Sequence, residues 1–125
     1  MPDVEPLEAH NGFRPPFQEV QVAGRTYRLV LNPRLHRLGD AEGMFVGDMQ
    51  EIMLDDSEDT SIENTEVVLV HELLHAVLDS MGCGKLSKRE KFVTGFSELW
   101  YQVIRQWVRG RLEQAALSAE EKGDA

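Results

Sequence analysis

The chain has 125 residues, 42% of them hydrophobic and 28% charged, which is the size and composition of one globular domain that buries a core without disulfides. Its formal net charge of −9, from 13 basic and 22 acidic residues, disfavours nucleic-acid binding through a basic surface. No apolar run is long enough to span a bilayer, the first residues lack the basic-then-apolar form of a signal peptide, and Cys83 is the single cysteine. We therefore expect a cytoplasmic protein that has neither a membrane nor a nucleic acid as its partner.

The charges are separated along the chain. Residues 38–84 contain twelve Asp or Glu and no Lys or Arg, whereas residues 85–111 contain seven Lys or Arg against Glu90 and Glu98. An acidic central block attracts basic partners over a distance, so a basic peptide or protein is one expected partner. The alternative is that this block is only a solvated surface that keeps a small protein soluble.

The first part of the chain predicts an arm and a hairpin. Residues 1–16 hold four of the five prolines and are expected to form a flexible N-terminal arm, which is the candidate for a latch over any site. Residues 17–31 alternate with a period of two around a turn at Ala23-Gly24, which predicts a β-hairpin. Residues 34–43 are polar and are expected to be a connecting loop.

A second hairpin is predicted further along the chain. Its strands are residues 44–46 and 51–54, which are apolar except for Glu51 and flank a turn at Gly47-Asp48. The second of these strands directly precedes the first long helix, and we expect it at the edge of the sheet. An extended peptide can pair with such an edge by strand addition.

Two helices are predicted to follow the strands. The first has a candidate cap at Thr60 or Ser61 and ends at the Gly82-Cys83-Gly84 run. The second opens at Ser87 and carries an apolar stripe that is expected to lie in the core. The expected apolar face of the first helix is Val67, Val70, Leu74, Val77, Leu78 and Met81, and that of the second is Phe92, Val93, Phe96, Leu99, Trp100, Val103, Ile104 and Trp107.

The order of strands and then helices predicts an α+β fold. We expect a small antiparallel sheet of N-terminal hairpins packed against two long C-terminal helices, in a single domain over residues 17–112. Residues 113–125 are polar and are expected to form a frayed C-terminal tail.

The motif that points to chemistry is His71-Glu72-Leu73-Leu74-His75, an H-E-x-x-H on the first helix. Two histidines at i and i+4 lie one turn apart on the same helix face, so both imidazoles can reach one metal ion. Zinc is the metal expected for two imidazoles and a carboxylate with an open position. Glu72 stands beside the first ligand, where it can accept a proton from a water that the metal has acidified.

A catalytic zinc site needs a third protein ligand. No histidine follows His75, so the candidates are Glu90 and Glu98 on the second helix. On a helical wheel Glu98 points to solvent, whereas Glu90 lies at the edge of the buried face. Glu90 also fits a capping box that starts at Ser87, so the residues by themselves leave ligand and cap as two open alternatives.

These segments resemble a known family. Residues 68–78 resemble the active helix of small phage and prophage metallopeptidases, which are minimal zincins of the gluzincin type related to the ImmA/IrrE group. Residues 88–93, followed by Phe96 and Leu99, are similar to that family's second helix, and residues 27–33 and 43–54 are similar to its strands. The resemblance implies a zinc metalloendopeptidase.

In the residues of this chain, the resemblance implies zinc bound by His71, His75 and Glu90, with Glu72 as general base and a peptide or protein as substrate. Tyr101 is a candidate donor to the transition state, or else an amphipathic residue at the helix surface. His36 is a second candidate on a loop that closes over the cleft, or else a solvated loop histidine.

Two other functions compete with the peptidase. The domain can be a zinc-binding structural or regulatory protein of a phage or prophage without turnover. It can also be a helical interaction module that binds no metal.

Overall fold

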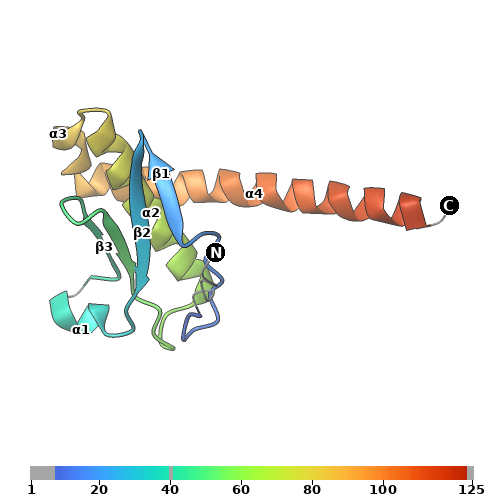
Figure 1. Cartoon of the computed structure of the whole chain (residues 1–125), viewed down its shortest axis with the longest axis horizontal. Coiled ribbons are helices and arrows are strands. Elements are labelled where there is room, and N and C mark those ends of the chain that lie inside the picture. Colours follow the sequence, from blue (N-terminus) through green and yellow to red (C-terminus); the bar gives the residue numbers. More distant parts are fainter. Residues whose placement is uncertain (1–7, 40, 124–125) are drawn as a thin grey trace, which may run out of the picture.

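The computed structural model describes residues 8–39 and 41–123. It has four strands, two long helices and two short ones, with the strands in the first half of the chain (Figure 1). The predicted α+β fold class is therefore confirmed. The first seven residues of the expected arm and the last two of the expected tail lie outside the described residues.

Both predicted hairpins are present. Strands β1 (Glu19–Val22) and β2 (Arg25–Leu31) pair antiparallel, and so do β3 (Gly43–Val46) and β4 (Glu51–Leu54). The first hairpin turns through two residues with positive φ, 52° and 80°, at the expected Ala23-Gly24. Such two-residue turns match the right-handed twist of the strands.

The sheet is mostly antiparallel, as predicted, but its two hairpins join through a parallel pair that the prediction did not include. The strand order is β1-β2-β4-β3, and β2 runs parallel to β4 with Leu29 opposite Ile52 and Leu31 opposite Leu54. Strand β4 is therefore interior, and the predicted edge position belongs to β3. Parallel strands need a crossover, and local alternation along a strand carries no information about it.

The crossover contains a short helix where a loop was predicted. Helix α1 (Leu35–Gly39) follows the end of β2, and the side chain of Leu35 is buried. The backbone N–H of Leu35 donates to the carbonyl of Asn32, which tightens the chain directly after Pro33. This turn returns the chain so that β3 can begin on the far side of β4.

Helix α2 (Ile62–Ser80) packs across the sheet and carries the H-E-x-x-H motif. Its cap is Ser61, whose hydroxyl accepts from the N–H of Asn64. The face that α2 buries most deeply differs from the predicted apolar face, because several of its buried residues are small or polar. The buried residues of α2 are Thr65, Leu69, Glu72, Ala76 and Leu78, of which only Leu78 belonged to the predicted set.

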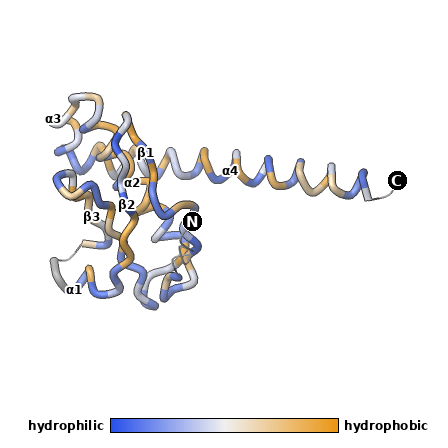
Figure 2. The backbone as a smooth tube through the Cα atoms, in the orientation of Figure 1, coloured by the Kyte–Doolittle hydropathy of each residue, from blue (hydrophilic) through white to orange (hydrophobic). Residues whose placement is uncertain are grey.

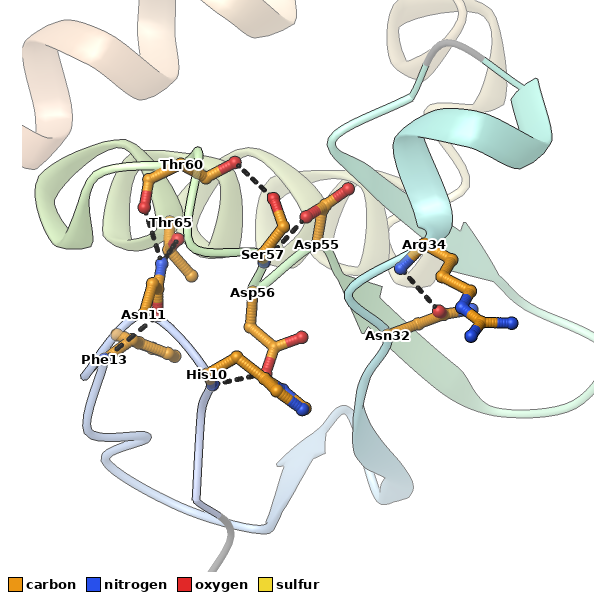
Figure 3. A network of polar contacts seen from close by, with 10 residues as sticks. All are labelled: His10, Asn11, Phe13, Asn32, Arg34, Asp55, Asp56, Ser57, Thr60 and Thr65. Carbon is orange, nitrogen blue, oxygen red and sulfur yellow. Dashed lines mark hydrogen bonds and ion pairs between the residues drawn. The ribbon is translucent and has the colours of Figure 1, made fainter.

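The described part of the expected N-terminal arm packs onto the domain, and this corrects its boundary. Phe13 is 4% exposed and belongs to the core cluster. The side-chain amide of Asn11 donates to the carbonyl of Thr60 and to the hydroxyl of Thr65, and His10 binds the buried Asp56 (Figure 3). The packed domain therefore begins well before residue 17.

Helix α3 (Gly84–Ser87) is a single turn that leads into α4 (Glu90–Gly123). Helix α4 packs against α2 and α3 with its first part and then extends away from the domain (Figure 1). The prediction that the chain frays after residue 113 is wrong, because the helix continues to Gly123. Within the described ranges, no helix is apolar over a stretch long enough to cross a membrane.

The predicted apolar stripe of α4 is mostly exposed, which corrects its assignment to the core. Helix α4 lies on α2 along one narrow line of side chains, so only Val93, Ser97 and Tyr101 are buried. The hydrophobic pattern predicts an apolar helix face that is more stable when buried. It does not predict whether another part of the same chain buries it. The residues left at least one-third exposed are Phe92, Phe96, Leu99, Trp100, Val103 and Trp107.

Candidate metal centre

Helix α2 presents two imidazoles to one point. The Nε2 atoms of His71 and His75 lie 3.3 Å apart, as expected for histidines one helical turn apart. The two side chains are 19% and 13% exposed, so they line a cleft and remain reachable from solvent. Phe45 on β3 stacks on the ring of His75, with an interplanar angle of 12°. The strand and the helix together therefore fix the ring orientation.

Glu90, the first residue of α4, brings a carboxylate to the same point. Its Oε2 lies 3.2 Å from Nε2 of His71, and its Oε1 lies 3.1 Å from Nε2 of His75. The side chain is 64% exposed, so water reaches this side of the cluster. Glu98, the other candidate, is exposed on the same helix and lines the outer part of the cleft.

The capping alternative for Glu90 is not formed. A capping box needs Glu90 three residues into the helix, whereas α4 begins at Glu90 itself. The hydroxyl of Ser87, the expected cap, lies 2.8 Å from Nδ1 of His75. Both partners of the expected box are therefore turned toward the histidines.

The three side chains have the spacing that a tetrahedral zinc ion requires. Bonds of about 2.0–2.1 Å at tetrahedral angles place neighbouring ligand atoms about 3.3 Å apart. The two Nε2 atoms are 3.3 Å apart, and each lies 3.1–3.2 Å from a different oxygen of Glu90, so the three side chains converge at close to this spacing. Among the described residues, His71, His75 and Glu90 are the one group of three His, Cys, Asp or Glu that is close enough to hold a metal ion. Two imidazoles and one carboxylate leave a fourth position free, which is the donor set of catalytic zinc sites.

Ser87 belongs to the candidate site, although the sequence interpretation assigned it to a helix cap. Its hydroxyl lies 2.8 Å from Nδ1 of His75. When Nε2 of His75 gives its lone pair to a metal, the ring proton is on Nδ1, and Ser87 is placed to accept it. Ser87 is 7% exposed, so water competes little for this hydrogen bond. Its contact with His75 depends on the turn made by α3, and no local sequence pattern signals that turn.

Glu72 is the buried acid of the site. Its side chain is 8% exposed, and its Oε1 lies 4.0 Å from Nε2 of His71. Burial, with a smaller contribution from the charge of Glu90, raises the pKa of Glu72 to about 7. A carboxyl group with a pKa near neutrality can both accept and return a proton at physiological pH.

The pKa of His71 is shifted in the direction that favours metal binding. Burial lowers it, the nearby His75 lowers it further, and Glu90 partly opposes them. The imidazole therefore stays neutral to a lower pH than an exposed histidine does. A neutral ring is the form that donates its lone pair to a metal.

Gly43 on β3 brings the edge strand close to Glu72. A Cβ at this position would lie 2.4 Å from the side chain of Val68 and 3.3 Å from Oε1 of Glu72. A residue with a side chain would therefore push β3 away from α2 at the point where Glu72 is held. The glycine lets strand backbone form one wall of the site.

These elements enclose a cleft of about 870 Å³. Its floor is the motif face of α2, one wall is β3, and the other wall is the first two turns of α4. Glu42 and Glu98 stand on opposite sides of it, and Lys88 is the one lysine or arginine among its lining residues. Acidic side chains therefore outnumber basic ones in the cleft lining.

The structure does not bring Tyr101 or His36 to the metal centre. Tyr101 is buried, and its hydroxyl donates to Oε1 of Glu66 at 3.4 Å, outside the cleft lining. Burial raises the pKa of Tyr101, and the charge of Glu66 adds to the effect, so the phenol stays protonated as a donor.

His36 lies on α1 and binds the buried Asp55 through both its backbone N–H and its ring. Burial alone would raise the pKa of Asp55, but the hydrogen bonds from Ser57 and His36 together lower it. His36 therefore stabilises the loop that leads into α2.

Comparison with known proteins adds no further information on the fold or the site. No protein family, no curated protein and no solved structure matches this chain.

Proposed function

We propose that this protein is a zinc-dependent metallopeptidase. His71, His75 and Glu90 hold the zinc, and Glu72 is the general base. The observation that carries this proposal is the convergence of the three side chains from α2 and α4, at 3.1–3.3 Å, beside one buried carboxyl group. The resemblance of residues 68–93 to small phage and prophage zincins supports the same assignment.

The chemistry follows from the placement of Glu72. Bound zinc supplies the Lewis acidity that lowers the pKa of a water in the cleft. Glu72 accepts a proton from that water while the water oxygen attacks the carbonyl carbon of the scissile peptide bond. Glu72 then delivers the proton to the nitrogen of the leaving amine, so the carboxylate is regenerated when the C–N bond breaks.

The shape of the cleft favours an extended peptide as substrate. In the described sheet, β3 pairs with β4 on one side only, and β3 forms a wall of the cleft. A peptide can add to this edge as a further strand, with its scissile bond near Glu72. Glu42 and Glu98 favour basic side chains on either side of that bond.

The cellular setting is part of the same proposal. Cys83 is the single cysteine and is free, which is typical of a protein in a reducing compartment. The family resemblance points to a phage or prophage protein of the cytoplasm.

The proposal is tested by hydrolysis of unstructured, lysine-rich and acidic peptides by the zinc-loaded protein. Glu72→Gln should keep zinc and lower kcat by about 10²–10⁴-fold, because it removes proton transfer and leaves the ligands in place. Glu19→Gln, an exposed position on β1, is the matched control and should leave kcat unchanged. Full activity in Glu72→Gln would contradict the general-base assignment. Zinc binding without hydrolysis of any peptide would favour the non-catalytic regulatory protein.

A further inference from the structure

Helix α4 carries an aromatic stripe that this chain does not cover. We use this name for Phe92, Phe96, Leu99, Trp100, Val103 and Trp107, which are between 37% and 66% exposed. At 100° per residue they lie within an arc of roughly 100° on one side of the helix. The rings of Phe92, Phe96 and Trp100 contact one another in sequence, with centroids 5.8 and 6.2 Å apart. The stripe is therefore one continuous apolar surface.

This surface is large for a chain that stays alone in water. The exposed fractions of its six side chains amount to roughly 600 Å², taking about 150–250 Å² for a whole aromatic side chain. That is at the upper end of the largest apolar patches found on monomers, and patches of this size mark interaction sites.

The outer half of α4 also lacks support from its own domain. The helix stands clear of the other elements beyond its first turns, and apolar residues recur along it (Figures 1 and 2). Every residue from 111 to 123 is exposed. A helical segment of this length is only marginally stable in water by itself, so a partner that packs along α4 would stabilise it.

We propose that a second copy of this chain covers the stripe, with the two α4 helices antiparallel. The stripe is symmetric about the midpoint between Leu99 and Trp100. In the antiparallel register centred there, Phe92 meets Trp107, Phe96 meets Val103, and Leu99 meets Trp100, and each contact occurs twice. A surface that is complementary to itself in this way is what a two-fold dimer requires.

The charges just before α4 disfavour a parallel arrangement of two copies. Lys85, Lys88 and Arg89 form a basic cluster on the segment that leads into the stripe. In the antiparallel register the basic clusters of the two copies lie at opposite ends of the paired stripes. A parallel pair would instead place the two basic clusters side by side, where they repel.

The area is sufficient for a specific dimer. Two stripes bury about 1,200 Å² in total, which is at the lower end of specific interfaces. A partner on the stripe leaves the cleft open. The cleft residues Glu90, Thr94 and Glu98 lie roughly opposite the stripe on the helix. Dimerisation and metal binding are therefore separate properties, and each can fail without the other.

The test is the mass of the protein in solution, measured by sedimentation equilibrium at about 100 µM, above the micromolar dissociation constants common for such areas. Wild type should have twice the chain mass of 14.2 kDa. Val103→Glu should reduce it to 14.2 kDa, whereas Val108→Glu should not. Val103 and Val108 are 48% and 51% exposed, but Val108 lies outside the stripe, so the pair isolates the stripe itself.

A cross-link tests the register. In a Cys83→Ser background, Leu99→Cys should form a disulfide-linked dimer on mild oxidation, because the two-fold axis brings the two copies of position 99 together. Val108→Cys in the same background should stay unlinked. A wild-type mass of one chain, or equal masses for Val103→Glu and Val108→Glu, would overturn the proposal and leave the stripe to a different partner. Zinc content, measured on the same samples, reports separately on the proposed function.

Discussion

At the scale of single residues, the groups of the metal centre differ in how well the sequence alone predicts them. His71, Glu72 and His75 form a motif with fixed spacing, so one helix is enough to predict that they meet. Glu90 was predicted only as one of two alternatives, because a helical wheel cannot place one helix relative to another. Ser87 was assigned to a cap, since its contact with His75 depends on the turn made by α3.

Replacing Ser87 tests whether it orients His75. Ser87→Ala removes the acceptor for Nδ1–H and should weaken zinc affinity by about 10–100-fold, the usual effect of losing an outer partner of a ligating histidine. Competition with a chromogenic chelator measures this affinity. Ser80→Ala, at an exposed position at the end of α2, is the matched control and should bind zinc as wild type does. An unchanged affinity in Ser87→Ala would show that Phe45 packing alone orients the ring.

At the scale of elements, local pattern predicted what local contacts determine. The alternation in residues 19–31 and 43–54 predicted both hairpins, because each strand pairs with its neighbour in the chain. The parallel pairing of β2 with β4 joins segments that are distant in sequence, and it was not predicted. The same limit applies to α4, where hydrophobicity marked the stripe but not its exposure.

The contact of the N-terminal segment with the loop before α2 makes stability depend on pH. The hydrogen bond to Asp56, and then the charge of Asp56, raise the pKa of His10 above its ordinary value of 6.5. Protonated His10 thus stabilises the folded state fully below pH 6.5, and this contribution is lost as the pH rises through the raised pKa.

His10→Ala should therefore lower the free energy of unfolding more at pH 6 than at pH 9. Urea denaturation of wild type and variant at the two pH values measures the difference. An equal loss at both pH values would show that the imidazole contributes by packing and not by charge.

At the scale of the whole molecule, the metal centre lies where three parts of the fold meet. Helix α2 supplies the histidines and Glu72, α4 supplies Glu90, and α3 between them supplies Ser87. Bound zinc would link the start of α4 to the middle of α2, and α4 has few other buried contacts. We expect zinc to stabilise the packing of α4 on the domain as well as to support catalysis.

The most direct test of this account is the zinc content of the purified protein, measured by elemental mass spectrometry after equilibration with zinc and gel filtration. The site predicts about one zinc per chain in wild type, since its three ligands come from a single chain. Glu90→Gln should lose most of the metal, whereas the matched control Glu98→Gln, on the same helix and in the same cleft, should retain it. No zinc in wild type, or equal zinc in the two variants, would contradict the assignment of His71, His75 and Glu90 as the metal ligands.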